Sequence, residues 1–264
     1  MTVAWKADYA AQTDQGRVRT KNQDVPIVDP ERSVFAVSDG IGGIPYGRET
    51  AQLAEKMIPP LADELTGRTP EEILLHLRSG IDSVSNAIRD CGNDEDHGVV
   101  FGATISGFVV AGNGAAVFNM GDSRVYRLRN GRLQCLTKDH SVVQILLDAG
   151  EITPEEAEHH SSKGRITRFL GMMPESMATV LMVDIQPGDR FLVCSDGLHG
   201  MVPDRELQRM LSAETSAQAI CEDMIRAANE AGGMDNITAV VWIARPVDTD
   251  ATDIRADVPV VTKR

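Results

Sequence analysis

The stretch Val34–Gly43, with the sequence VFAVSDGIGG, decides the fold, because an apolar run stops there at Asp39 and is followed by glycines. Such a run between turn residues is typical of a short buried strand. A second stretch of this kind, FLVCSDG at Phe191–Gly197, ends at Asp196. Two buried strands that end alike can direct two carboxylates to one point. An all-oxygen site of that kind suits Mg²⁺ or Mn²⁺.

The composition indicates a globular protein with an acidic surface. The chain has 264 residues, of which 42% are hydrophobic, and a formal net charge of −13. This charge argues against a nucleic-acid partner, whose phosphates require Lys and Arg. General solubility explains the acidity, and carboxylates gathered for a metal are the alternative. We expect no signal peptide and no membrane span, because the chain has neither a basic start with an apolar run nor a long apolar stretch.

The cysteines favour a reducing compartment, so we expect a cytoplasmic protein. None of the four belongs to a CxxC pair or to a zinc-binding spacing. They are Cys91, Cys135, Cys194 and Cys221.

The hydrophobic periodicity predicts an α+β fold. Strands are expected at 4–12, 25–28, 33–38, 179–185, 190–194 and 237–243. Helices are expected at 47–65, from 70 to about 91, at 140–149, from 154, at 203–211 and at 216–231.

Between 99 and 136 the apolar period becomes two, with Asn-Gly turns, which predicts an antiparallel meander rather than a doubly wound parallel sheet. Helix pairs around two runs of strands predict a layered sandwich. We expect one domain at 1–244 and a flexible tail at 245–264.

Five aspartates share one setting, since each lies at the end or beginning of an expected strand, beside small residues or a turn. They are Asp24, Asp39, Asp122, Asp196 and Asp235. A single aspartate at such a position is commonly a turn residue that binds its own backbone. Five of them with the same flanks favour a shared metal site.

The glycines after Asp39 raise the alternative of a phosphate-binding loop. The dinucleotide pattern would need Gly at position 45, where Pro45 stands, and no Walker A motif is present. The simpler interpretation is that Gly40 lets its carbonyl oxygen approach an ion. Arg19 has the side chain for bidentate phosphate capture, although a surface arginine is the alternative.

Six short motifs, in this order and spacing, resemble those of metal-dependent protein serine/threonine phosphatases of the PP2C (PPM) type, above all the compact bacterial members. They are RxxNQD at 19–24, DGxGG at 39–43, GAT at 102–104, GDSR at 121–124, SDG at 195–197 and DN at 235–236. The resemblance runs from about Tyr9 to Ile243. It implies an α-β-β-α sandwich, with two mainly antiparallel sheets flanked by helix pairs, and a centre of two Mn²⁺ or Mg²⁺ ions.

The resemblance also implies roles for individual residues. Asp39 would bridge the two metals, and Asp196 and Asp235 would complete the first. The carbonyl of Gly40 would bind the second metal, with Asp24 in its shell through water.

Further roles follow from the same resemblance. Asp122 would serve a weaker third metal together with Asp196, and Arg19 would hold the substrate phosphate. A mobile flap is expected at about 144–170. Ile41 stands where some relatives have a histidine that acts as general acid, so water or another group must protonate the leaving oxygen.

The implied function is hydrolysis of phosphoserine and phosphothreonine in proteins by a metal-activated water. The implied partners are phosphorylated proteins and a bacterial Ser/Thr kinase whose action the enzyme opposes, and we expect a monomer. Two alternatives stay open: a catalytically silent phosphatase-like binding module, and a phosphatase of small phosphate esters.

Overall fold

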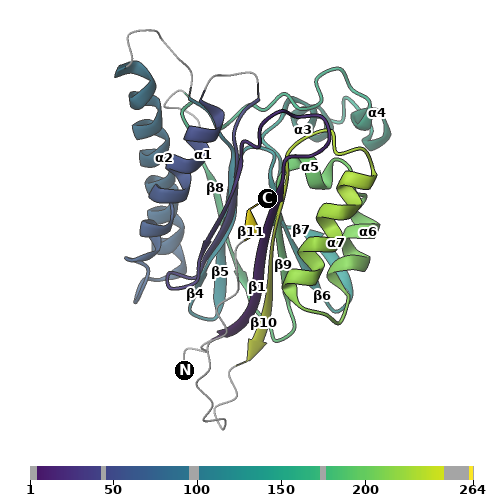
Figure 1. The fold of residues 1–264 in the computed structure, drawn as a ribbon. Coiled ribbons are helices and arrows are strands. Elements are labelled where there is room, and N and C mark those ends of the chain that lie inside the picture. The colour runs from purple at the N-terminus through teal and green to yellow at the C-terminus, as the bar shows by residue number, and fades with distance from the viewer. Residues whose placement is uncertain (1–4, 43–45, 95–100, 173–176, 247–261, 264) are drawn as a thin grey trace.

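The computed structural model describes residues 5–42, 46–94, 101–172, 177–246 and 262–263. In these residues the strands form two sheets that face each other (Figure 1). Sheet A has the strand order β11-β1-β10-β9-β6-β7 and sheet B the order β2-β3-β4-β5-β8. Every pairing is antiparallel except that of β11 with β1.

The strands of sheet A are β1 (Trp5–Asp14), β6 (Arg124–Arg129), β7 (Arg132–Cys135), β9 (Arg190–Cys194), β10 (Ile237–Pro246) and β11 (Thr262–Lys263). Those of sheet B are β2 (Asp24–Asp29), β3 (Val34–Asp39), β4 (Ile105–Ala111), β5 (Gly114–Met120) and β8 (Thr179–Asp184).

An aromatic cluster fills the space between the two sheets. The ring of Phe108 from sheet B lies 4.8 Å from that of Phe191 and 5.8 Å from that of Trp242, both from sheet A. Phe35 packs on Phe108 with 5.4 Å between the ring centroids. These side chains are at most 2% exposed. Their burial therefore holds the two sheets together.

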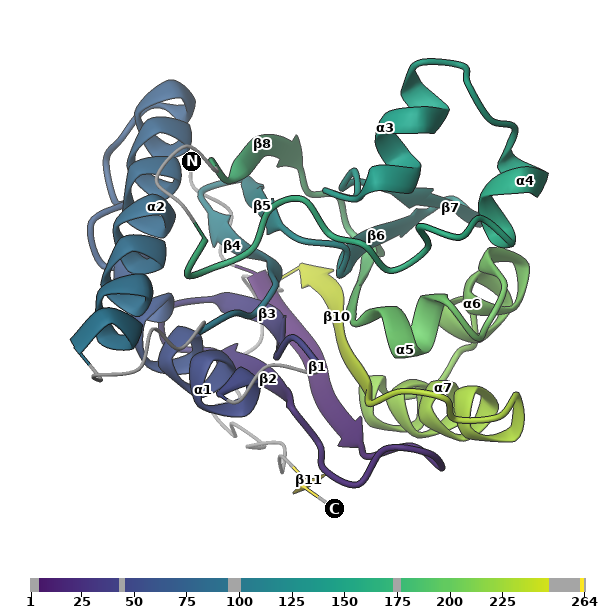
Figure 2. The ribbon, with the colours of Figure 1, turned by 90° about the horizontal axis from the view of Figure 1, so that it is seen from above.

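Helices cover the outer face of each sheet. Sheet B is covered by α1 (Gly47–Met57) and α2 (Pro70–Asp94), and sheet A by α6 (Asp204–Leu211) and α7 (Ala217–Glu230) (Figure 2). This arrangement confirms the predicted α-β-β-α sandwich of the α+β class. The first helix is shorter than expected, because Pro59 and Pro60 follow its end and a 3₁₀ turn, η1 (Pro59–Ala62), replaces its last part.

The predicted meander at 99–136 is divided between the two sheets. The hairpin β4–β5 belongs to sheet B and the hairpin β6–β7 to sheet A. The turn at 121–123 carries the chain across, with Gly121 at a φ of 132°. Each hairpin is antiparallel as predicted, but the hydrophobic period does not report which sheet a strand joins.

The expected flap lies between β7 and β8 and contains α3 (Val142–Asp148) and α4 (Pro154–Glu158). Its two ends are joined, since the backbone N–H of Thr167 donates to the carbonyl of His140 at 2.7 Å. Most of the expected tail, 247–261 and 264, lies outside the described residues, while Thr262 and Lys263 pair with β1. None of the described helices has the length and apolar character needed to cross a bilayer.

Candidate metal centre

Asp24 and Asp39 lie side by side at one end of sheet B. They are directly opposite each other in the pairing of β2 with β3. The backbone of Asp39 is fixed on its other side, because its N–H donates to Oγ1 of Thr104 at 3.1 Å and its carbonyl accepts from the N–H of Thr104 at 2.7 Å. The GAT motif therefore sets the position of the strand end that carries Asp39.

Asp196 and Asp235 lie at the matching end of sheet A. Asp196 follows β9 as the first residue of α5 (Asp196–His199), and Asp235 precedes β10, the neighbour of β9. The two segments approach closely, since a Cβ added to Gly197 would lie only 2.0 Å from the carbonyl oxygen of Asn236. Only glycine permits this approach.

Hydroxyl groups of sheet A hold the carboxylate of Asp24 from sheet B. Ser195 Oγ and Thr238 Oγ1 each donate to Asp24 Oδ2 at 2.7 Å. Asp24 is 2% exposed. Its other oxygen, Oδ1, is buried and has no hydrogen-bond partner among the described residues. A buried carboxylate oxygen without a partner is costly, which points to a ligand that the chain itself does not supply.

The pKa values of these carboxyl groups reflect how deeply they are buried and how close they lie. Burial raises the pKa of Asp24 to about 6, although hydrogen bonds with Ser195, Thr238 and Asp39 act in the opposite direction. Burial, then Asp235 and Asp24, raise the pKa of Asp196 to about 7. Burial, followed by the charges of Asp24, Asp196, Asp122 and Asp235, raises the pKa of Asp39 well above its usual value. The carboxylates therefore repel one another when no cation is present.

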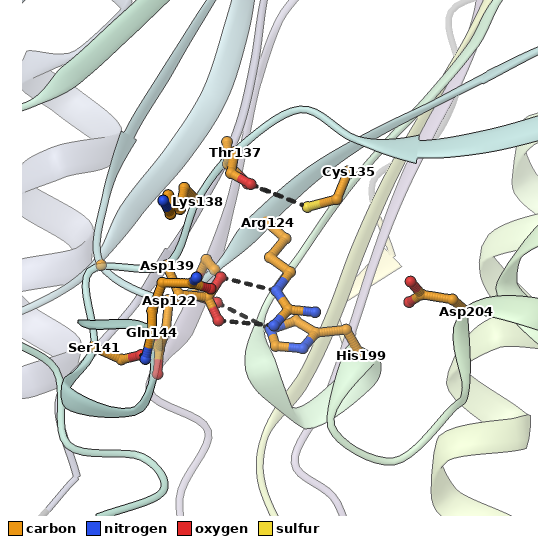
Figure 3. Close-up of polar contacts among 12 residues, drawn as sticks. Asp122, Arg124, Cys135, Thr137, Lys138, Asp139, Ser141, Gln144, His199 and Asp204 are labelled. Carbon is orange, nitrogen blue, oxygen red and sulfur yellow. Dashed lines mark hydrogen bonds and ion pairs between the residues drawn. The ribbon is translucent and has the colours of Figure 1, made fainter. Parts of the chain in front are cut away.

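Asp122 joins the group from the turn that crosses between the sheets. Burial and the charge of Asp196 raise the pKa of its carboxyl well above the usual range. His199, at the end of α5, contacts the carbonyl oxygen of Asp122 through Nε2 at 2.9 Å (Figure 3). Burial and the nearby Arg124 lower the pKa of His199 to about 4, so this imidazole is neutral at pH 7.

Arg19 lies at the exposed edge of the centre. Its Nη2 lies 2.6 Å from Oδ2 of Asp235, and the side chains are 45% and 34% exposed. A Cβ added to Gly42 would lie 3.2 Å from Nη1 of Arg19, so the guanidinium covers the glycine loop. Gly40 is buried, and a Cβ there would collide at 2.4 Å with the backbone of Gly47.

The donor set fits hard divalent cations, although the side chains are not yet in a coordinating arrangement. Within the described ranges, no three His, Cys, Asp or Glu side chains form a group that could hold a metal ion as it stands. The free Oδ1 of Asp24 and the mutual repulsion of the carboxylates favour a cation between them. Arg19 donates to Oδ2 of Asp235, so this ion pair competes with a metal for that oxygen.

Sequence reasoning missed the supports of the carboxylates. Ser195 and Thr238 hold Asp24, and the side chain of Asn236 accepts from the N–H of Gln23 at 2.9 Å and donates to the carbonyl of Lys21 at 2.9 Å. Ser195 and Asn236 lie within motifs that the sequence displays. Nothing in the sequence singles out Thr238, because threonine is an ordinary residue in a strand and Thr238 belongs to none of the motifs.

Comparisons with known proteins agree with this geometry. The family model of protein phosphatase 2C matches residues 14–241. The serine/threonine phosphatase stp of Listeria welshimeri is 35% identical over 234 residues, which are 87% of this chain and 93% of that protein.

Solved structures are similar as well. The serine/threonine phosphatase PstP/Ppp of Mycobacterium tuberculosis has a TM-score of 0.82 at 34% identity, with 90% of this chain and 99% of that chain covered. The catalytic domain of PstP in complex with two manganese ions has a TM-score of 0.80 at 32% identity, with 92% of this chain and all of that chain covered. The chain belongs to the protein phosphatase 2C family.

Proposed function

We propose that this chain hydrolyses phosphoserine and phosphothreonine in proteins, using two Mn²⁺ or Mg²⁺ ions and a weaker third. The observation that carries the proposal is the partnerless buried oxygen of Asp24 within a group of carboxylates whose pKa values are raised, first by burial. The manganese ions of the related PstP domain support the same choice of metal. When bound, such ions supply an acidic water as nucleophile and offset the charge of the phosphoryl oxygens.

The residues of the centre would bind the metals in different ways. Asp39 would bridge the two ions, and Asp196 and Asp235 would complete the first site. The carbonyl of Gly40 would serve the second, with Asp24 in its shell. Ser195 and Thr238 support this by fixing one oxygen of Asp24, which leaves the other to accept a bond from a bound water.

Asp122 would bind the third ion together with Asp196. Arg19 would orient the substrate, because its exposed guanidinium lies beside the carboxylates and can form two parallel bonds to a phosphate. The bond to Asp235 uses one N–H of Nη2, so the other N–H groups of the guanidinium remain for a phosphate. The neutral His199 already directs Nε2 to a backbone carbonyl, which makes it a poor proton donor to the leaving oxygen.

The wider assignment follows from the family. We infer a phosphatase domain at 1–244 with a flap at about 144–170 and a tail from 245, of which Arg245 and Pro246 still pair with β1 as the end of β10. We also propose that the protein is a cytoplasmic monomer that opposes a Ser/Thr kinase. A catalytically silent binding module is disfavoured, because all five aspartates are present.

The direct test uses p-nitrophenyl phosphate. We expect excess EDTA to abolish hydrolysis and Mn²⁺ to restore it. Asp39→Asn and Asp196→Asn should each lose at least about 99% of the turnover, which corresponds to roughly 3 kcal/mol of transition-state stabilisation. Asp223→Asn, on the exposed face of α7, serves as a control for the loss of one charge and should match the wild type.

Circular dichroism shows whether each inactive variant is folded, so that a loss of turnover is not confused with unfolding. Turnover that persists in excess chelator contradicts the metal mechanism, and wild-type turnover of Asp39→Asn removes that residue from the centre. Comparison of phosphopeptides with nucleotides separates a protein phosphatase from a phosphatase of small esters, because only the former should prefer the peptides.

A further inference from the structure

A cavity of about 870 Å³ begins at the metal centre and continues between the flap and the segment that leads from α5 to α6. At one end it is lined by Asp122 and Asp196, two of the proposed metal ligands. At the other end lies Asp204, at the start of α6. We call this cavity the flap groove. A phosphate held at the centre places the neighbouring residues of its chain within reach of the groove.

The two walls of the flap groove come from different segments. One wall is the continuous stretch from His199 to Asp204, which leads from α5 to α6. The other wall is the flap, with residues of α3 and α4 and the turn that follows (Figure 2). The apolar lining residues are Val143, Leu147, Pro154, Ala157, Met201, Val202 and Pro203. An extended peptide with apolar side chains suits such walls.

The positive charge nearest the floor of the groove is already compensated. Arg124 donates through Nε and Nη2 to the two carboxylate oxygens of Asp139, both at 2.8 Å (Figure 3). These two side chains are 28% and 13% exposed. Because the bidentate pair uses the charge of Arg124, this arginine offers little attraction to an acidic ligand.

The same network prepares Asp204 as an acceptor. Nη1 of Arg124 donates to the hydroxyl oxygen of Tyr126 at 3.0 Å, and that hydroxyl donates to Oδ1 of Asp204 at 3.3 Å. Burial raises the pKa of Tyr126, so its proton stays in place. Oδ2 of Asp204 has no bond to any other described residue. Asp204 is exposed and points toward Arg124 (Figure 3), so one oxygen is anchored and the other is available to a ligand.

Two further charges line the flap side. The exposed carboxylate of Glu158, at the end of α4, has no hydrogen bond or ion pair to the described part of the chain. Lys163 donates to the backbone carbonyl of Glu158 at 3.2 Å, so its ammonium partly offsets this carboxylate. Asp204 is therefore the acidic group that acts most strongly on a ligand.

We propose that the flap groove selects phosphoprotein segments that carry an arginine or lysine a few residues from the phosphorylated residue, with Asp204 as the main acceptor and Glu158 as a weaker one. This inference rests on the proposed phosphatase function. The centre attracts the phosphate, and Asp204 favours a basic side chain and disfavours an acidic one at the far end of the groove. Asp204 would thus determine specificity without touching the reacting atoms.

The test is a panel of phosphopeptides in which a single arginine is moved along the sequence on both sides of the phosphoserine, with alanine and glutamate peptides as references. We expect kcat/KM to be higher for arginine at one or more positions, by up to about five-fold over alanine, as for a partly exposed ion pair. Asp204→Asn should bring this ratio close to one. Glu158→Lys should lower it by a smaller factor and favour the glutamate peptide.

Glu206→Gln is the matched control, since it removes one charge from the same helix outside the groove and should keep the wild-type ratio. Anisotropy of the labelled peptides without their phosphate, on the full chain in EDTA, gives a binding ratio for the groove alone, because the metal-free carboxylates then have no phosphate to repel. A wild type that shows no arginine preference in binding, or an Asp204→Asn variant that keeps it, overturns the groove assignment. Absence of hydrolysis by the wild type with Mn²⁺ instead counts against the proposed function.

Discussion

Without metal, the buried carboxyl of Asp24 should make the protein less stable as the pH rises. Its pKa is raised to about 6 in the folded protein from an ordinary value of 3.8, first because it is buried. The folded state then binds more protons than the unfolded state between these two values. The stability that this group contributes is present below pH 3.8 and is lost as the pH rises through about 6.

The magnitude follows from the two pKa values. Their separation corresponds to about 3 kcal/mol in total, of which about 2 kcal/mol falls between about pH 4.5 and pH 7.5. The neutral His140 and His199, whose pKa values are lowered to about 4, act in the opposite direction over the same range. The wild-type pH profile is therefore a sum of opposing contributions. The useful quantity is the difference between the wild type and Asp24→Asn, which cancels the histidines. The difference also contains the change in the pKa of Asp39 and Asp196, which the charge of Asp24 raises, and this change acts in the same direction as the loss of Asp24 itself.

The assay is urea denaturation in EDTA, followed by the fluorescence of the two tryptophans, Trp5 and Trp242, of which Trp242 is 2% exposed between the sheets. We expect the stability of Asp24→Asn relative to the wild type to increase by about 2 kcal/mol from about pH 4.5 to pH 7.5. Saturating Mn²⁺ should reverse the order at pH 7.5, because a cation favours the ionised carboxylate. A difference that stays constant with pH in EDTA would falsify the assignment of Asp24 as a strained, buried carboxyl.

Two other changes test the remaining parts of the centre and the core. Arg19→Lys should raise KM for p-nitrophenyl phosphate by about ten-fold, because one ammonium cannot replace a bidentate guanidinium; an unchanged KM in steady-state kinetics would exclude Arg19 as the phosphate ligand. Phe108→Ala should lower the free energy of unfolding by about 3–5 kcal/mol, because it opens a cavity between the sheets. Leu75→Ala, at a side chain that is 67% exposed, is the control and should change the stability by less than about 1 kcal/mol.

The sequence predicts the layers and the strand ends well, because these depend on local patterns. The strand expected at 33–38 is β3 at Val34–Asp39 in the structure, one residue further along, since alternation and apolar runs reflect the chemistry of neighbouring residues. The division of the hairpins between the sheets could not be predicted. It depends on which strands pair, as when Arg124 lies opposite Cys194, and the hydrophobic period is the same in both sheets.

The sequence predicts the carboxylates of the site, but not the side chains that hold them by hydrogen bonds. Thr238 donates to Asp24 from 214 residues away, and neither residue has a neighbour in sequence that reveals the contact. The same holds for Arg124 and Tyr126, whose bonds make Asp204 an acceptor at the end of the flap groove. A motif identifies residues by their order and spacing in the sequence. A hydroxyl group that holds a metal-binding carboxylate is brought to it by the packing of the two sheets, which the spacing does not show.

The position of the centre follows from this packing. Strand ends from both sheets meet at one edge of the sandwich, and carboxylates placed there repel one another in the absence of metal. That repulsion is tolerated because the aromatic cluster of Phe35, Phe108, Phe191 and Trp242 holds the sheets together without help from the site. The aromatic cluster between the sheets thus stabilises the fold, and the carboxylates at the edge of the sheets provide the affinity for cations. A protein built in this way can hold its own carboxylate side chains close together before any ion is bound.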